Sequence, residues 1–300
     1  MSQQKTVCVA DCSGNTGKTL VRRLLRRGYN VHAATQASGD FNVNVVRGLT
    51  FEESKRLKMC RYDPFDYRSI VDAVRDCYGL FYCFEPSQDQ EDVYDEYTVE
   101  MEVRAAHNVL EACAQTVTID KVVFTSSATA VIWKENRKSV SVDESNWSDV
   151  NFCRKFKLWH ALGKTLAEKT AWALAMDRDL EMVSINSGLV TTVNSDVRVT
   201  NPYLKGAAEM YEDGVFVTVD SEFLADAHVC VYEDTSSFGR YLCFDNLISL
   251  PEEADKFAKM LTPPQSESSP ASSLCAGAIM PRIHNRKISK LMVNFHTTDI

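Results

Sequence analysis

The segment Thr6-Val-Cys-Val-Ala-Asp-Cys-Ser-Gly-Asn-Thr-Gly17 decides the fold of this chain, because it links a strand pattern to a helix pattern through a short turn. Residues 7–10 form a continuous apolar run, which is typical of a short strand buried on both faces. Beyond the turn, apolar side chains recur with helical spacing until Gly28, at Leu20, Val21, Leu24 and Leu25. We therefore predict a buried strand, a tight turn and an amphipathic helix.

The same alternation continues to about residue 190. Short apolar runs predict further buried strands, and helical patterns lie between them: strands at 29–34, 122–124 and 182–185, helices at 67–76, 99–114 and 158–176. Buried strands that alternate with helices are typical of a parallel sheet covered on both faces. The predicted fold class is therefore α/β, with a doubly wound parallel sheet of the Rossmann type.

The pattern changes after about residue 190, where mixed short segments replace the regular alternation. We assign residues 6–190 to a dinucleotide-binding domain and residues 191–300 mainly to a smaller C-terminal substrate lobe. A segment at about 215–245 is expected to return to the first domain. The polar stretch at 262–273 predicts an exposed loop, and residues 286–291 predict a final helix.

Composition and charge argue against several classes of function. The chain has 300 residues and a formal net charge of −8, with 33 Lys and Arg against 41 Asp and Glu. An acidic chain repels phosphate backbones, so we expect no nucleic-acid partner. No apolar run approaches the ~20 residues that span a bilayer, so we expect no membrane partner. The ten cysteines are spaced singly, without metal-site spacing, and predict free thiols, a cytoplasmic location and no bound metal.

The turn after the first strand is the candidate cofactor site. Folds of this kind bring a dinucleotide pyrophosphate to the N-terminus of the first helix, where small residues let the backbone approach closely. We expect binding by the turn residues Ser13, Gly14, Asn15, Thr16 and Gly17. Asp11 stands where a first glycine is usual. Its charge disfavours an anionic ligand unless the side chain points away or caps the turn.

The residue at the end of the second strand selects between the two nicotinamide dinucleotides. An acidic side chain there holds the ribose hydroxyl of NAD, whereas an arginine holds the 2'-phosphate of NADP. This chain has the neutral Gln36, so both NAD(H) and NADP(H) stay open as cofactors. Positive charge follows at a distance, at Lys55, Arg56 and Lys58. Asp63, after the next strand, is the candidate partner of the adenine amino group.

Five stretches carry a resemblance to a known family: Tyr62-Asp-Pro-Phe-Asp-Tyr67, Asn108-Val-Leu-Glu-Ala-Cys113, Val122-Val-Phe-Thr-Ser-Ser127, Val142-Asp-Glu-Ser-Asn-Trp-Ser-Asp149 and Gly239-Arg-Tyr-Leu-Cys243. From about residue 6 to residue 295, the chain resembles the extended short-chain dehydrogenase/reductases, in particular the plant cinnamoyl-CoA reductase and dihydroflavonol reductase group. The Asp-Glu-Ser-x-Trp-Ser-Asp run is highly specific to that group. Leu158-Trp-His160 is similar to a cinnamoyl-CoA reductase-like branch with His in place of the catalytic Tyr.

The resemblance implies an NAD(P)H-dependent oxidoreductase whose partner is a small molecule, an aromatic carbonyl or an acyl-CoA thioester, in phenylpropanoid metabolism. It places the family's catalytic serine at Ser127 and its lysine at Lys164, while His160 takes the place of the catalytic tyrosine. Ser187 stands where a proline is usual. The thioester assignment rests on the resemblance alone.

The substituted histidine changes the acid–base chemistry that the site offers. An imidazolium has an ordinary pKa of about 6.5, and Lys164, one helical turn away, is expected to lower the pKa of His160. Most of His160 is then neutral at pH 7, although neutral imidazole still donates an N–H hydrogen bond. The apolar residues that we expect to line the substrate cavity are Ile132, Trp133, Tyr203, Leu204 and Met210.

Three functions stay open from the residues. The first is the reductase, which the retained Ser127 and Lys164 favour. The second is a nucleotide-binding pseudo-reductase with a regulatory or scaffolding role, which Asp11 and Gln36 favour. The third is a non-redox isomerase or cyclase that uses His160 as a general base. The oligomeric state is not predicted.

Overall fold

A computed structural model describes residues 5–36, 48–84, 94–135, 141–191, 201–261 and 279–297. The loop predicted at 262–273 lies outside these residues. Within them, the strands of the main sheet are β1 (Thr6–Ala10), β2 (Asn30–Thr35), β3 (Leu57–Arg61), β4 (Gly79–Tyr82), β5 (Lys121–Ser127), β6 (Met182–Ser187) and β9 (Gly239–Cys243). All pair in parallel, in the order β3-β2-β1-β4-β5-β6-β9. The predicted doubly wound parallel sheet is confirmed.

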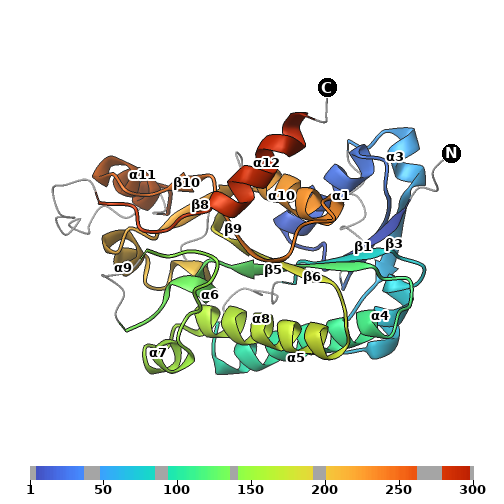
Figure 1. The fold of residues 1–300 in the computed structure, drawn as a ribbon, viewed down its shortest axis with the longest axis horizontal. Helices are drawn as coiled ribbons and strands as arrows, with labels where there is room; N and C mark the ends of the chain where they lie inside the picture. The colour runs from blue at the N-terminus through green and yellow to red at the C-terminus, as the bar shows by residue number, and fades with distance from the viewer. Residues whose placement is uncertain are drawn as a thin grey trace.

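Helices cover both faces of this sheet (Figure 1). One face carries α1 (Asn15–Arg26), α10 (Ser221–Glu233) and α12 (Arg286–Thr297). The opposite face carries α4 (Tyr67–Val74), α5 (Glu96–Ala114) and α8 (Trp159–Asp177). Both sides of the sheet are therefore buried, which explains why β1 and β4 are almost wholly apolar rather than alternating.

The helix ends follow local signals. α1 stops just before Gly28, which adopts a left-handed φ of +93°, as the sequence predicts. α5 begins three residues before the predicted start at Val99, because a capping box lies outside the apolar pattern. The Asp95 carboxylate accepts from the Thr98 backbone N–H at 2.9 Å, and the Thr98 hydroxyl oxygen accepts from the Asp95 N–H.

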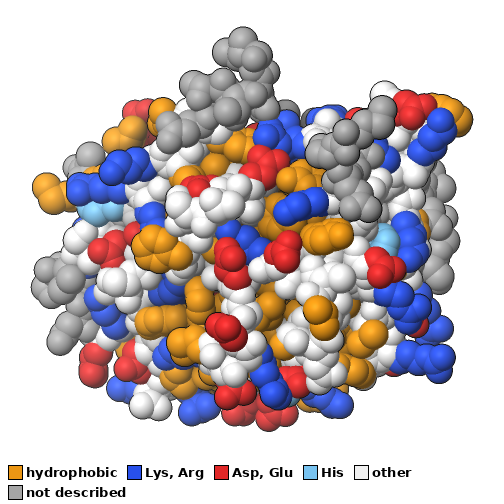
Figure 2. Space-filling model, turned by 45° about the vertical axis from the view of Figure 1, so that its right-hand side comes forward, with side chains coloured by type: hydrophobic (Ala, Val, Ile, Leu, Met, Phe, Trp, Pro, Cys, Tyr) orange, Lys and Arg blue, Asp and Glu red, His pale blue; other side chains and the backbone are white. Residues whose placement is uncertain are grey.

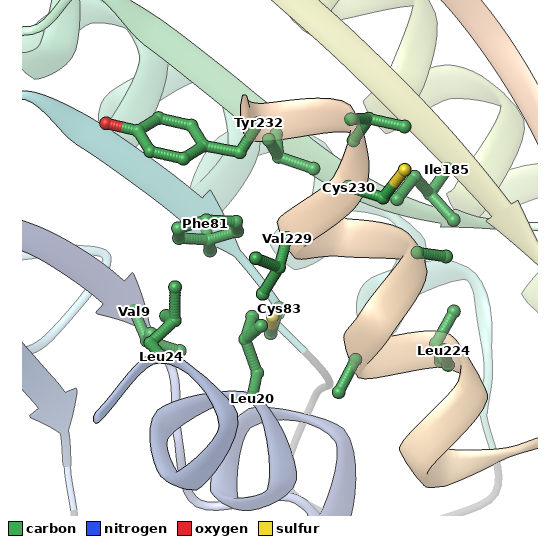
Figure 3. Packing of buried hydrophobic residues seen from close by; sticks show 14 of the residues in the cluster. Val9, Leu20, Leu24, Phe81, Cys83, Ile185, Leu224, Val229, Cys230 and Tyr232 are labelled. Atoms are coloured by element: carbon green, nitrogen blue, oxygen red, sulfur yellow. The ribbon is translucent and has the colours of Figure 1, made fainter. Parts of the chain in front are cut away.

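A hydrophobic core lies between the sheet and the helices α1 and α10. Figure 3 shows Leu20 and Leu24 of α1, Val9 and Phe81 of the sheet, and Val229 of α10 gathered in one cluster. All five side chains are fully buried. Burial of each contributes about 1.5–3 kcal/mol relative to exposure. The apolar stripe predicted for the first helix is thus the surface by which α1 packs on the sheet.

Strand β5 runs further than its apolar residues predict. Its last two residues, Ser126 and Ser127, pair in register with Asn186 and Ser187 of β6. The Ser126 hydroxyl donates to the buried carboxylate of Glu168 at 2.8 Å, so this polar end is satisfied inside the protein. The strand therefore carries Ser127 to the carboxyl edge of the sheet, where ligands bind in α/β folds.

A second, three-stranded sheet lies at one end of the molecule. It consists of β7 (Leu189–Thr191), β8 (Val217–Asp220) and β10 (Asn246–Leu247), in the order β10-β8-β7. The short helices are α3 (Phe51–Lys55), α6 (Thr129–Ile132), α7 (Val150–Lys155), η2 (Pro202–Leu204), α9 (Ala207–Glu212) and α11 (Pro251–Leu261). In Figure 1, α9 and α11 lie beside β8 and β10. The division predicted near residue 190 stays a prediction, since β8 joins the small sheet whereas α10 and β9 accompany the main one.

The surface mixes both signs of charge. Acidic and basic side chains are interspersed across the face shown in Figure 2. In the described part of the chain, no helix has the length and apolar character needed to cross a membrane.

Candidate active site

A cavity of about 360 Å³ opens at the carboxyl ends of the central strands. The predicted site residues that line it are Ser13, Gly14, Asn15, Thr16, Ser127, His160 and Lys164. Its volume falls within the range of small-molecule sites. The structure therefore brings the first turn, the end of β5 and the start of α8 to one hollow.

The first turn fits an anionic ligand. Gly14 is the N-cap of α1 and no side chain caps the helix there, so the first N–H groups of α1 are left for another acceptor. Asp11 adopts φ +61° and its Oδ1 accepts from the Ser13 N–H at 3.1 Å and from the Ser13 hydroxyl at 2.5 Å. The carboxylate thus caps the turn, which is one of the two arrangements that keep Asp11 compatible with a dinucleotide.

Gly17 allows a close backbone contact between α1 and the turn that precedes it. It is buried and is not among the residues that line the cavity. A Cβ at this position would lie 2.6 Å from the Asp11 carbonyl oxygen and 2.6 Å from Cys12 Cα. Glycine is required because backbone atoms meet here, so Gly17 allows the close approach of α1 to the turn.

Two predicted cofactor residues lie at strand ends outside the cavity lining. Gln36 directly follows β2, and Asp63 lies two residues after β3. The Asp63 carboxylate accepts from the Phe65 N–H at 2.9 Å and so caps its own turn. Arg61, at the end of β3, pairs in register with Thr35 and brings a positive charge to the edge where Gln36 lies.

The lysines considered as charge donors lie elsewhere. Lys58 is near the start of β3, in register with His32, and Lys55 pairs with Glu52 at 2.9 Å on α3. The start of β3 lies at the edge of the sheet opposite to the one formed by the carboxyl ends of the strands. Arg61 was missed because nothing in the sequence sets the pairing register between β2 and β3.

Ser127, Thr129 and His160 form a hydrogen-bonded chain on the cavity wall. The Thr129 hydroxyl donates to Ser127 Oγ at 3.0 Å, and the Thr129 N–H donates to the same oxygen at 3.2 Å. His160 Nδ1 lies 3.2 Å from Thr129 Oγ1. We assign the proton of a neutral His160 to Nδ1, because the single hydroxyl proton of Thr129 is directed to Ser127. Ser127 accepts twice here, so its own O–H is available to a ligand in the cavity.

His160 stays neutral at physiological pH. Burial, and then the charge of Lys164, lower the pKa of His160 to about 3. The ring packs edge-on against Tyr94, with centroids 5.5 Å apart, and lies 6.1 Å from the Tyr203 ring. Only a small fraction of His160 is therefore an imidazolium at pH 7. The lowering of its pKa has the direction that the sequence predicted from the charge of Lys164.

Lys164 belongs to a buried ion pair. Its Nζ lies 2.5 Å from Glu102 Oε1 and 3.4 Å from the Phe84 carbonyl oxygen. The other oxygen of Glu102 accepts from the Tyr94 hydroxyl. Glu102 is 1% exposed and Lys164 8% exposed. Neither Tyr94 nor Glu102 was predicted, because no local motif links α5 to α8.

The predicted substrate wall is mostly core. Tyr203 lines the cavity and donates its hydroxyl to the Val217 carbonyl at 3.2 Å. Ile132, Trp133 and Met210 lie in the apolar core of the small lobe, and Leu204 packs against that core. Apolar character predicted burial correctly but did not distinguish the core from the cavity. Apolar side chains that join Tyr203 in the lining include Phe84, Leu189 and Val190.

Comparisons with known proteins agree with this architecture. The pattern of the NAD dependent epimerase/dehydratase family matches residues 7–202. The chain is 33% identical over 292 residues to cinnamoyl-CoA reductase 1 of Petunia hybrida, which covers 95% of this chain and 84% of that protein. It is 33% identical over 256 residues to dihydroflavonol 4-reductase of Arabidopsis thaliana, which covers 81% of this chain and 66% of that protein.

Solved structures show the same fold. Vestitone reductase from alfalfa has a TM-score of 0.71 at 24% identity, covering 96% of this chain and 92% of that chain. Yeast methylglyoxal/isovaleraldehyde reductase Gre2, complexed with NADPH, has a TM-score of 0.70 at 19% identity, covering 96% and 93%. The sequence match is the stronger finding, and it makes this protein an NAD(P)-dependent oxidoreductase with NAD(P)(H) as its cofactor class. The chain belongs to the NAD dependent epimerase/dehydratase family, the extended short-chain dehydrogenase/reductases.

Proposed function

We propose that this chain is an NAD(P)H-dependent reductase of the cinnamoyl-CoA reductase-like type, acting on an aromatic carbonyl or an acyl-CoA thioester. One observation carries the proposal: the first turn, Ser127, His160 and Lys164 line a single cavity. That cavity joins a helix N-terminus suited to a dinucleotide to a hydroxyl suited to a carbonyl oxygen. Reduction needs both groups in one place.

The turn and Lys164 are proposed to hold the cofactor, which supplies a hydride when it is bound. The uncapped N-terminus of α1 suits the pyrophosphate. Lys164 has three N–H donors, and Glu102 and the Phe84 carbonyl engage two of them. The third is assigned to a ribose hydroxyl. Arg61, beside the neutral Gln36, is the residue proposed to favour a 2'-phosphate.

Ser127 is proposed to bind the substrate oxygen through its free O–H. A donor aimed at the oxygen stabilises the negative charge that develops there as the carbon is reduced. Neutral His160 acts as a positioning residue, because its Nδ1–H fixes Thr129 and Thr129 fixes Ser127. With a pKa of about 3, His160 is a weak base, so the isomerase or cyclase alternative loses its general base.

An aromatic substrate suits the lining. Phe84, Leu189, Val190 and Tyr203 supply apolar wall to a cavity that polar side chains also line. The names of the relatives, a cinnamoyl-CoA reductase and a dihydroflavonol 4-reductase, support a phenylpropanoid-related substrate. The cysteines in the described residues are all free thiols, in line with the cytoplasmic location that we propose.

The test combines cofactor titration with a carbonyl panel. NADPH and NADH binding is measured by nucleotide fluorescence, and the panel contains a hydroxycinnamoyl-CoA thioester, a hydroxycinnamaldehyde and a dihydroflavonol. We expect binding below millimolar and turnover of at least one panel member. Ser127→Ala should lower kcat by about 10²–10³-fold, and Lys164→Ala should also weaken cofactor binding. Ser289→Ala, an exposed serine on α12, is the matched control.

Two outcomes overturn the proposal. Absence of binding below millimolar removes the dinucleotide site. Tight binding without turnover of any panel member favours the pseudo-reductase with a regulatory or scaffolding role.

A further inference from the structure

We propose that Tyr94 is a further catalytic residue: its phenol gives the proton to the substrate oxygen, and Glu102 links that phenol to Lys164. The inference rests on the proposed reductase function and deepens it. It assigns the proton donor that α8 lacks to a tyrosine on another segment of the chain.

Tyr94 lies in the right place for this role. It comes just before α5 and lines the same cavity as Ser127, His160 and Lys164. Its ring meets the His160 ring edge-on, with an interplanar angle of 79°. The phenol therefore stands beside the residue that replaces the family's tyrosine.

Glu102 connects the phenol to the lysine through its two oxygens. Oε2 accepts from the Tyr94 hydroxyl, and Oε1 lies 2.5 Å from Lys164 Nζ. A Cβ on Gly163 would lie 2.5 Å from Tyr94 Oη and 2.7 Å from Glu102 Oε2. Glycine at this position of α8 thus leaves the space in which the phenol and the carboxylate meet. Both oxygens of this buried carboxylate have partners, and a buried charge without a partner would be strongly destabilising.

The other polar side chains of the site are less suited to donate this proton. The one N–H of neutral His160 points to Thr129, so it has no proton for the substrate. Ser127 binds the oxygen but is a poor acid. Burial, and then Glu102, raise the pKa of Tyr94 well above its usual value, so the phenol keeps its proton across the physiological range. The phenol is therefore protonated, and able to donate, when the substrate binds.

When bound, the cofactor would supply a hydride to the carbonyl carbon and be oxidised by two electrons, which would leave the π electron pair on the substrate oxygen. The Tyr94 hydroxyl turns from Glu102 to that oxygen, its O–H bond breaks, and an O–H bond forms on the product. A proton from the Lys164 ammonium then passes through the Glu102 carboxylate to the phenolate. Solvent reprotonates Lys164.

The test uses two variants and one control. Tyr94→Phe removes the hydroxyl and keeps the ring against His160. Glu102→Gln keeps the size of the side chain and one acceptor oxygen, but it removes the negative charge and does not relay a proton. Tyr97→Phe is the matched control, because Tyr97 is a 66% exposed tyrosine on α5. For each protein we would measure kcat and KM on the carbonyl that the parent reduces, the NADPH Kd by fluorescence, the Tm, and the solvent isotope effect on kcat.

We expect Tyr94→Phe to lower kcat by about 10²–10⁴-fold, the usual contribution of a general acid. Its KM, NADPH Kd and Tm should stay near those of Tyr97→Phe. Glu102→Gln should lower kcat with a larger solvent isotope effect than the parent, because proton resupply becomes slow.

Three results would overturn the assignment. Tyr94→Phe with a kcat within about 3-fold of Tyr97→Phe shows that the phenol is not the donor. A loss of NADPH binding or Tm that parallels the loss of kcat shows a structural role instead. A parent that binds NADPH and reduces no carbonyl overturns the proposed function together with this step, whereas the first two results leave the proposed function intact.

Discussion

His228 should make the stability of this protein fall in mild acid. The ring is fully buried in α10. Nδ1 donates to the Leu224 carbonyl at 2.7 Å, so Nε2 accepts from the Thr125 hydroxyl at 2.7 Å. Burial lowers the pKa of His228 to about 4, against the opposing effect of the Leu224 carbonyl. The folded protein therefore holds a neutral imidazole where the unfolded chain takes up a proton.

The magnitude follows from the two pKa values. An unfolded histidine titrates near 6.5. The contribution of neutral His228 to the free energy of unfolding is therefore fully present above that pH, and it is lost as the pH falls toward 4. The gap is about 2.5 pH units, and each unit corresponds to about 1.4 kcal/mol, which gives about 3.5 kcal/mol in all. That is a large part of the about 5–15 kcal/mol by which a domain is stable.

The assay is urea unfolding at pH 7.5, 6.5, 5.5 and 4.5 for the parent, His228→Gln and Thr125→Val. His228→Gln should be less stable at pH 7.5, and the difference from the parent should shrink by about 1.4 kcal/mol per pH unit below 6.5. Thr125→Val loses the hydrogen bond but keeps the imidazole, so it should retain the parental slope. If the parent and His228→Gln lose stability in parallel, the buried neutral histidine is not the cause and the reasoning is refuted.

Three further predictions concern Arg240 of β9, Gln36 at the end of β2 and Gly17 in the turn between β1 and α1. Arg240→Met should lower the free energy of unfolding by about 3–5 kcal/mol in urea titrations. The reason is that Glu168, which is 0% exposed, would stay charged but lose its ion-pair partner at 2.8 Å. A change below about 1 kcal/mol would count against this prediction. Gln36→Arg should strengthen NADP binding by about 1–2 kcal/mol, measured by calorimetry, through a charge-assisted bond to the 2'-phosphate; equal gains for NAD would contradict this placement. Gly17→Ala should weaken dinucleotide binding and lower the Tm, because its Cβ would meet backbone atoms of Asp11 and Cys12 at 2.6 Å; unchanged fluorescence titrations and melting curves would show that the turn adapts.

Much of the fold was readable from local patterns. The apolar run of β1, the glycines of the turn and the stripe of α1 each record burial at one position, and burial depends mainly on which face of an element meets the core. The helical pattern at 158–176 placed Lys164 one turn after His160, whereas Ser127 was singled out by the family resemblance. Boundaries were less exact where a polar cap, such as Asp95, begins a helix before its apolar pattern.

The substrate wall shows the limit of that reading. Trp133 and Tyr203 are both buried aromatic residues of the small lobe, yet only Tyr203 is among the residues that line the cavity. Apolar character predicts that a side chain is buried away from water. It does not state whether the side chain faces the core or a cavity, because both are apolar surroundings.

The sequence by itself determined the parallel sheet and the strand, turn and helix with which it begins, because each depends on neighbours along the chain. The family resemblance identified His160 as the replacement for a tyrosine. Only the tertiary structure decided that Asp11 caps its turn, that Thr129 joins His160 to Ser127, and that Glu102 pairs with Lys164 and Tyr94. The physical reason is the same in the last two cases. A buried polar group takes its partner from whichever element packs against it, and the packing of α5 on α8 is a contact between residues far apart in the sequence.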